Sequence, residues 1–138
     1  ISELPALISK AHENSIPVIV DAAWGGHFGF NSQIPAHVLQ LGADALITSV
    51  HKALPGYSAS ALLLAQGKFL NLARIEQSFE TTHTTSPAGA PLASIDACRA
   101  LLQTRGEQLT GELLKYVQDF KNAVQSHFDA PIFLNPSD

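Results

Sequence analysis

The 138-residue chain has few of the features that mark several large classes of protein. It has one cysteine, Cys98, so it cannot form an internal disulfide. No apolar run approaches the roughly 20 residues that a membrane-spanning helix needs. The net charge is −4 and basic residues do not cluster, which argues against nucleic acid as a partner. These absences predict a cytoplasmic protein that binds neither membranes nor nucleic acid.

Charged residues and methionine are also scarce. Charged side chains make up 14% of the chain, against a typical value of about 25%. This low fraction suggests that other protein covers much of the surface. Because methionine is absent even at position 1, we expect the chain to be an incomplete piece of a longer polypeptide. A functional site would then be only partly present.

Several well-known catalytic patterns are missing as well. The six histidines show neither His-x-x-x-His nor Cys/His spacing, so no metal site is predicted. The chain has no Gly-x-Ser-x-Gly elbow and no glycine-rich phosphate loop, which argues against a hydrolase and a nucleotide-binding fold. We expect His27 to be a loop or interface histidine rather than a general base. Cys98 is expected to be a small buried hydrophobe rather than a reactive thiol.

The hydrophobic pattern predicts an α/β chain. Apolar residues spaced three and four apart indicate amphipathic helices, whereas short continuous apolar runs indicate buried strands. A strand, a short helix and a second strand within about 30 residues form one right-handed βαβ unit, so these strands should be parallel. The next strand follows too closely for a crossover helix and should be antiparallel. The expected elements are a helix at 4–13, a buried strand at 16–20, a loop at 22–33, a short helix at 35–41, strands at 45–48 and 60–65, a helix at 68–79, a polar loop at 81–87, and helices at 91–102 and 107–128.

Two charged residues follow the two parallel strands. Asp21 comes directly after the first strand, and Lys52 follows the second, 31 residues later. Each has an ordinary explanation, because a strand-end lysine can reach solvent and a strand-end aspartate can cap a turn. Parallel strands, however, end at the same edge of a sheet, where α/β proteins bind ligands. An amine for a Schiff base and a carboxylate for the pyridinium nitrogen at one edge is what pyridoxal 5'-phosphate needs.

The neighbours of this pair suit the same cofactor. Ser49 lies three residues before Lys52 and can offer a hydroxyl to a phosphate group. His51 is a cationic neighbour that would favour a reactive amine. Ala23 is small enough to lie flat beneath a ring, and Trp24 belongs either to the core or to the wall of the site.

Three motifs in a fixed order add a resemblance to a known family. They are Val20-Asp-Ala-Ala-Trp-Gly-Gly-His-Phe-Gly-Phe30, then Leu41-Gly-Ala-Asp44 with Ser49-Val-His-Lys52, then Thr84-Thr-Ser-Pro87 with Leu92-Ala-Ser-Ile-Asp-Ala97. The sequence resembles the fold-type I pyridoxal-phosphate enzymes, and within them the ornithine/lysine/arginine decarboxylase family. The family motifs are Asp-x-Ala-(His or Trp), Ser-Thr-His-Lys and Thr-Ser-Pro before an Ala-Ser-(Leu/Ile)-Asp helix. Val50 stands where the family usually has threonine.

The resemblance implies a fold and an activity. The fold would be part of the three-layer α/β/α large domain of the aspartate aminotransferase type, with a mostly parallel sheet. Residues 1–138 would form the C-terminal half of its cofactor-binding domain. The reaction would be α-decarboxylation of arginine, lysine or ornithine to an amine that serves polyamine biosynthesis. The partners would be a small amino-acid substrate and further copies of the same chain, in a homodimer or a higher homo-oligomer.

The resemblance also implies roles for matching residues. Lys52 would be the Schiff-base lysine and therefore the catalytic residue, and Asp21 the partner of the pyridinium nitrogen. The other residues implied at the cofactor are Ala23 under the ring, Trp24 beside it, Ser49 and His51 at the phosphate, and Thr85 and Ser86 near the dimer interface.

Alternatives to this activity remain open. The chain could belong to another fold-type I enzyme: an aminotransferase, a lyase, or a decarboxylase of the glutamate/aromatic type. It could also be a homologue that keeps the fold without turnover, although a retained lysine–aspartate pair argues against this. The ring-stacking residue and the main phosphate loop of the family belong to an earlier half of the domain. We therefore expect residues 1–138 alone to have little or no activity.

Overall fold

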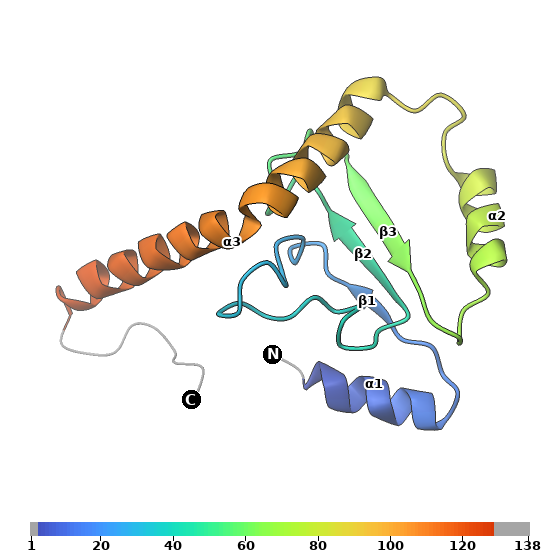
Figure 1. Cartoon of the computed structure of the whole chain (residues 1–138), viewed down its shortest axis with the longest axis horizontal. Coiled ribbons are helices and arrows are strands. Elements are labelled where there is room, and N and C mark those ends of the chain that lie inside the picture. Colours follow the sequence, from blue (N-terminus) through green and yellow to red (C-terminus); the bar gives the residue numbers. More distant parts are fainter. Residues whose placement is uncertain (1–2, 129–138) are drawn as a thin grey trace.

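The computed structural model describes residues 3–128 of the chain. It is an α/β structure in which helices surround a small sheet (Figure 1). Among the described residues, no helix is long and apolar enough to cross a bilayer. In chain order the elements are α1 (Leu4–Glu13), β1 (Ile19–Asp21), β2 (Ala45–Ser49), β3 (Ala61–Ala65), α2 (Leu72–Thr82) and α3 (Gly89–Gln125).

The sheet has three strands in the order β1-β2-β3. β1 and β2 are parallel, and β2 and β3 are antiparallel, which confirms both predicted pairings. The described sheet is therefore mixed. The α/β class is confirmed, while the three-layer arrangement and a mostly parallel sheet stay predictions.

The hydrophobic core lies where α1 meets the beginning of β2. Its buried side chains are Ile8 of α1, Val38, Ala43 and Leu46. α1 forms where it was predicted, and it ends at Asn14, whose backbone N–H bonds to carbonyls of the last turn. This packing fixes the start of β2, so the positions of the residues that follow β2 are set by a rigid strand.

One charged residue, Asp44, is part of this core. Its side chain is 2% exposed, and its Oδ2 atom accepts hydrogen bonds from the Val18 N–H and from His12 Nε2, both at 2.8 Å. Burial by itself would raise the pKa of Asp44, but the hydrogen bonds from Val18 and His12 outweigh it and lower the pKa. Through these hydrogen bonds, Asp44 connects the start of β2 to α1 and to Val18, which directly precedes β1.

The first strand differs from its prediction in length and burial. A wholly buried strand at 16–20 was expected, but β1 spans Ile19–Asp21, and Ile19 is 59% exposed. Pro17 has no N–H to donate to a ladder, so regular pairing begins after it. β1 is also an edge strand of the described sheet, with β2 as its one neighbour there, so it is open where the prediction placed a second neighbour.

The short helix predicted at 35–41 is a series of turns. Gln40 and Leu41 both donate to the His37 carbonyl, and Gly42 ends the segment at φ 98°. So short a segment gains few hydrogen bonds for the cost of starting a helix. The connection between β1 and β2 is therefore irregular, although it joins parallel strands as predicted.

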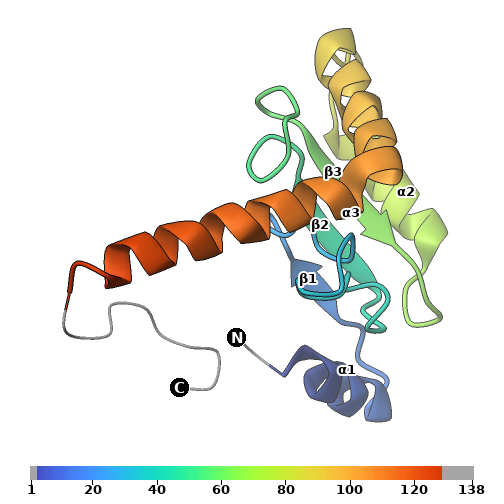
Figure 2. The same cartoon turned by 60° about the vertical axis from the view of Figure 1, so that its left-hand side comes forward.

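The two helices predicted at 91–102 and 107–128 form a single helix, α3, which bends near its middle (Figure 2). Gly106 occupies that middle and falls in the gap between the two predicted helices. A glycine costs a helix only about 1 kcal/mol, so it does not end one. The Thr110 hydroxyl bonds to the Gly106 carbonyl at 2.7 Å, a contact of the kind that bends helices.

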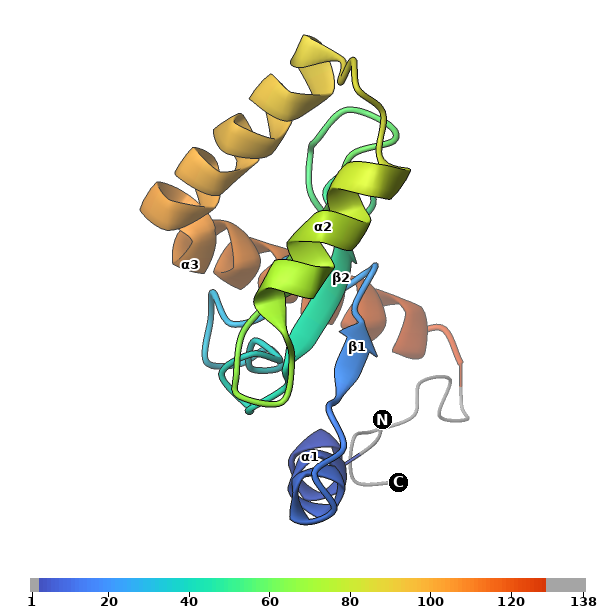
Figure 3. The ribbon, with the colours of Figure 1, turned by 90° about the vertical axis from the view of Figure 1, so that its right-hand side faces the viewer.

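α2 starts and ends later than predicted, at 72–82 instead of 68–79. The Asn71 side chain accepts a hydrogen bond from the Arg74 N–H and so defines the first turn. The polar loop predicted at 81–87 loses its first two residues to this helix. α2 lies beyond the β3 edge of the sheet (Figures 1 and 3).

Candidate active site

The backbone after β1 continues along the end of β2. Asp21 is paired with Ile47 in the parallel ladder. Beyond the ladder, the Ala22 N–H donates to the Ile47 carbonyl at 2.8 Å and the Ser49 N–H donates to the Ala23 carbonyl at 3.3 Å. Four of the predicted site positions, 21, 23, 49 and 52, therefore lie at or just beyond the same end of two adjacent strands.

The Asp21 side chain is exposed, and one of its two carboxylate oxygens accepts a hydrogen bond from a described residue. Its Oδ1 atom accepts a hydrogen bond from the Ala23 N–H at 3.0 Å, which is the turn-capping contact expected of a strand-end aspartate. Within residues 3–128, the Oδ2 atom has no hydrogen-bond or ion-pair partner. The turn therefore holds the carboxylate in place and leaves one oxygen for another molecule.

Lys52 is likewise exposed and takes part in no ion pair with any described residue. Its Nζ atom lies 5.4 Å from the centre of the Trp24 ring. Trp24 stands three residues after Asp21, so this contact joins the loop after β1 to the loop after β2. The structure thus brings Asp21, Trp24 and Lys52 to one edge of the sheet.

The loop that carries Lys52 is fixed at both of its ends. The Val50 N–H donates to the Ser60 carbonyl at 2.9 Å, and the Gly56 N–H donates to the Val50 carbonyl at 2.9 Å. A Cβ atom at Gly56 would come within 2.6 Å of that carbonyl oxygen, so only glycine permits this turn. The lysine is therefore presented by a short, constrained loop.

His51 and Ser49 occupy fixed positions on either side of Val50. The Nδ1 atom of His51 lies 2.7 Å from the Ser60 carbonyl oxygen, and since a carbonyl only accepts, Nδ1 carries the proton. The Nε2 atom is then the one that can face a ligand. Ser49 is buried at the end of β2, next to Ala23 through the backbone bond described above.

Thr85 and Ser86 are exposed in the loop between α2 and α3. The Ser86 N–H donates to the Thr84 hydroxyl at 3.2 Å, a local turn contact. Among the described residues, no hydrogen bond or ion pair joins Thr85 or Ser86 to Asp21 or Lys52. The structure does not bring these two residues into the cluster, and their expected place at a dimer interface stays a prediction.

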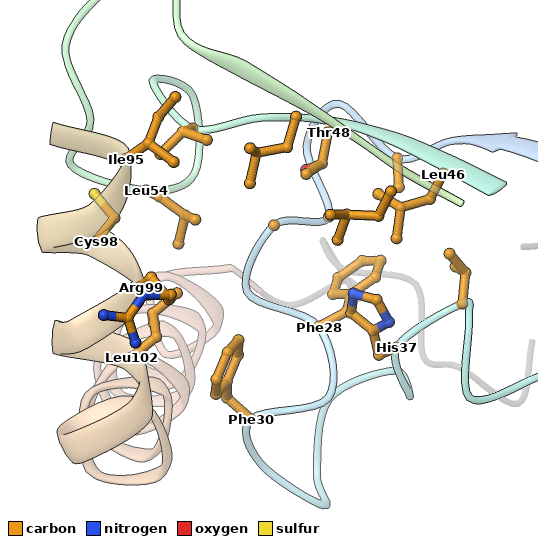
Figure 4. A pocket seen from close by; sticks show the side chains of 17 residues that line it. Phe28, Phe30, His37, Leu46, Thr48, Leu54, Ile95, Cys98, Arg99 and Leu102 are labelled. Atoms are coloured by element: carbon orange, nitrogen blue, oxygen red, sulfur yellow. The ribbon is translucent and has the colours of Figure 1, made fainter. Parts of the chain in front are cut away.

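A cavity of about 200 Å³ lies between the sheet and α3, behind the loop that follows β1 (Figure 4). Aromatic and aliphatic side chains such as Phe28, Phe30 and Leu102 line it. Arg99 and His37 also line it, but the Arg99 guanidinium already bonds to Asp96 and Gln103. Because the rest of the lining is mainly apolar, an anionic phosphate would lose its hydration there at a high cost in free energy, so the cavity suits the cofactor poorly. Cys98 lies at its wall and is buried, as predicted, and burial raises the pKa of its thiol. The open sheet edge, rather than this cavity, is the candidate site.

Three features of the described structure could not be predicted from the sequence. The His12–Asp44 contact joins residues 32 positions apart, and no local pattern reports such a pairing. Thr48 has a buried hydroxyl without a partner among the described residues, although its place in an apolar strand suggested only packing. The same holds for Nδ1 of His27, whose pKa is lowered by burial. A lowered pKa favours the neutral ring, and the loop role expected of His27 stays a prediction.

The edge of the sheet fits pyridoxal phosphate in the chemistry of its donors. Within residues 3–128, an exposed amine, a carboxylate with one oxygen outside any hydrogen bond, a small residue and a histidine held by a backbone carbonyl lie on adjacent loops. An α/β sheet with such a lysine and aspartate at its carboxyl edge is typical of cofactor-binding enzyme domains. Among the described residues there is no group of side chains that could hold a metal ion.

Comparison with known families identifies the chain more closely. The family model described as Orn/Lys/Arg decarboxylase, major domain, matches residues 1–137. The chain belongs to this family, and the resemblance noted from its motifs is confirmed.

Curated relatives agree with this assignment. The chain is 35% identical over 114 residues to an arginine decarboxylase of Bacillus subtilis (strain 168), which covers 83% of the chain and 23% of that protein. It is 32% identical over 123 residues to an arginine decarboxylase of Bacillus anthracis, with 89% of the chain and 25% of that protein covered. The uncharacterized protein YaaO of Bacillus subtilis (strain 168) is 31% identical over 138 residues, which is 99% of the chain and 28% of that protein. The chain thus spans about a quarter of the length of these relatives.

Proposed function

We propose that the chain is part of the pyridoxal-phosphate-binding domain of a decarboxylase that acts on arginine, lysine or ornithine. The observation that carries this proposal is the cluster at the sheet edge: among the described residues, a Lys52 amine without an ion-pair partner and an Asp21 oxygen without a hydrogen bond lie on adjacent loops. Membership of the Orn/Lys/Arg decarboxylase family supports it. Arginine is the first substrate to test, because four of the curated relatives that the chain matches carry the name arginine decarboxylase.

Asp21 and Lys52 would do different work at this edge. When bound, pyridoxal phosphate acts as an electron sink for the bond that breaks at the substrate α-carbon. Asp21 would keep a proton on the pyridine nitrogen through its free Oδ2, because the Ala23 N–H holds the other oxygen at 3.0 Å. Lys52 would supply the amine that holds the cofactor covalently, and its exposed loop leaves that amine accessible.

The surrounding residues would bind and orient the cofactor. Ala23 has no side chain beyond Cβ, so a ring can lie flat against it. Trp24 would wall the same side of the site. His51 would offer its ring to the phosphate in a fixed orientation, since the Ser60 carbonyl holds Nδ1. Ser49 would contribute a hydroxyl at the same place.

Exposed apolar surface supports the idea that this chain works as part of a larger domain. Ile47 pairs with Leu63, and Ile19 pairs with Ala45, two residues before Ile47 on β2, so the three side chains share one face of the sheet; each is more than two-fifths exposed. So large an apolar sheet face is normally covered by other protein. We propose that residues 1–138 form the C-terminal half of a three-layer domain in a cytoplasmic homodimer or higher homo-oligomer, with Thr85 and Ser86 near the subunit interface.

Reductive labelling of Lys52 tests the proposed function directly. Intact protein containing this sequence is incubated with pyridoxal phosphate, reduced with borohydride and digested, and the labelled peptide is found by mass spectrometry. We expect the label on Lys52. Lys52→Arg keeps the charge but cannot form the Schiff base, so it should lose the label and at least about 10³-fold of arginine decarboxylation.

Lys68 provides a matched control for this experiment. It is also an exposed lysine whose Nζ lies over an aromatic ring, that of Phe69, at 5.3 Å. Lys68→Arg should keep both label and activity. Label at Lys68, or no label at all, would reject the proposal. Label at Lys52 without amine product from arginine, lysine or ornithine would assign the site to another reaction of the same cofactor.

A further inference from the structure

The side chain of Trp24 is 69% exposed, which is unusual for so large an aromatic residue. The chain contains no other tryptophan. The ring therefore does not serve the core of the described structure. The cation that it meets is the Lys52 ammonium, 5.4 Å from the ring centre.

The backbone beneath Trp24 is rigid, so the position of the ring is set by the fold. The Ala23 N–H donates to Asp21, and the Gly25 N–H donates to the Ala22 carbonyl at 2.8 Å. Gly25 is buried, and a Cβ atom there would come within 2.9 Å of the Phe28 ring, so the turn after Trp24 depends on glycine. The lysine faces this ring from a loop that is held at both ends.

The ring is also the partner that the structure offers to the Lys52 charge. The three ion pairs of the described residues involve Lys10, His12 and Arg99 as cations, and none involves Lys52. A cation within about 6 Å of the face of a tryptophan ring is attracted by the ring quadrupole, and tryptophan is the best of the aromatic residues at this.

We infer that Trp24 is a positioning residue that holds the Lys52 ammonium at the sheet edge while no cofactor is bound. The contact between Lys52 and Trp24 is observed in the structure. Its role in the protein rests on the proposed function, in which Lys52 reacts with the cofactor. The amine has to leave the ring before it can bond to a carbonyl carbon. Trp24 thus defines a resting position of Lys52 at the edge of the sheet where β1 and Asp21 also end.

Competitive labelling of lysines tests this inference in the intact protein freed of pyridoxal phosphate. Formaldehyde with cyanoborohydride at low conversion methylates amines in proportion to their reactivity, and mass spectrometry reports each lysine. An exposed cation–aromatic contact is weak, so Trp24→Leu should raise the Lys52 labelling rate by about two- to fivefold. Trp24→Phe keeps an aromatic face and should give a smaller increase, which a role in packing alone would not predict.

Lys68 again serves as the internal control. Its labelling rate should not change in the Trp24 variants, which also shows that the fold is intact, and Phe69→Leu should raise labelling at Lys68 without affecting Lys52. Equal Lys52 rates in the native protein and in Trp24→Leu would overturn the inference. Equal increases in the Leu and Phe variants would overturn it too, because they would assign the effect to bulk rather than to the aromatic face.

Borohydride reduction of the same samples after addition of pyridoxal phosphate separates this inference from the proposed function. A change in Lys52 methylation without cofactor capture at Lys52 upholds the resting contact and rejects the proposed function. Cofactor capture at Lys52 with no change in methylation rejects the resting contact and leaves the proposed function standing.

Discussion

Asp44 and Asp21 lie at opposite ends of the paired strands β1 and β2, and their surroundings differ in every respect that matters for a carboxylate. Asp44 is 2% exposed and accepts two hydrogen bonds at 2.8 Å. Asp21 is exposed, and one of its oxygens has no partner among residues 3–128. A buried carboxylate whose Oδ2 atom joins two segments distant in sequence serves the fold, whereas an exposed one with a single local contact is available to a ligand.

The same division applies to the two ends of the sheet. At the start of β2, α1 packs Ile8 against Ala43 and Leu46, and polar groups have partners inside the chain. At the end of β2, the loops after β1 and β2 present Trp24 and Lys52 outward. Stability is therefore concentrated at one end of the sheet and candidate chemistry at the other, as in open α/β proteins generally.

Asp21→Asn should produce the largest effect among changes to the two carboxylates. An amide oxygen can still accept the hydrogen bond from the Ala23 N–H, so the turn and the stability of the protein should be unchanged. It cannot hold a proton on the pyridine nitrogen, so we expect a loss of about 10²- to 10³-fold in kcat for arginine decarboxylation, similar to the loss of a key electrostatic group in other enzymes. Steady-state kinetics of the intact protein, with cofactor content measured alongside, give the result.

Asp44→Asn is the matched control for that substitution. It changes the same charge in the same way at the other end of the strands, and it should lower stability with little direct effect on kcat. If Asp44→Asn reduced kcat as strongly as Asp21→Asn while the protein stayed folded, the division of roles between the two ends of the sheet would be wrong.

Much of the fold could be predicted because its signals are local. α1 shows the helical spacing of apolar residues, β2 and β3 are short apolar runs, and Gly42 marks the end of the segment that precedes β2. The secondary-structure predictions were wrong where the packing of the folded chain outweighed a local sequence signal. Gly106 suggested a break, but the long helix continues through it, and a Cβ atom there would come within 2.6 Å of the Phe30 ring.

Some features of the candidate site could likewise be predicted from the sequence, and others could not. The placement of Asp21 and Lys52 at one edge of the sheet could be predicted from strand direction, since parallel neighbours end at one edge. The contact between Trp24 and Lys52 and the pairing of His12 with Asp44 could not be predicted, because they join residues 28 and 32 positions apart through tertiary packing. Thr85 and Ser86 were expected near the site from a motif, and no described contact links them to it.

Asp44→Ala should have the largest effect on stability. The substitution leaves the Val18 N–H and the His12 ring without their shared acceptor in a buried place, which costs about 2–3 kcal/mol. Hydrogen exchange of the Ala45–Ser49 amides in the intact protein reports the stability of this region. Protection of these amides should fall strongly in Asp44→Ala and remain native in Asp21→Ala. Equal protection in both variants would contradict the structural role of Asp44.

Acid should have a smaller effect that again separates the two carboxylates. The hydrogen bonds from Val18 and His12 lower the pKa of Asp44 below its ordinary value of 3.8 in spite of its burial. A carboxylate with a lower pKa in the folded state adds stability above the unfolded value, and this stability is lost as the pH falls through the folded value. Exchange protection at β2, compared between about pH 6 and about pH 3, should therefore fall more in the native protein than in Asp44→Asn, which has no carboxylate to protonate there. Exchange protection in Asp21→Asn should depend on pH as it does in the native protein. If protection fell equally in the native protein and in Asp44→Asn, Asp44 would not contribute to the acid sensitivity of this end of the sheet.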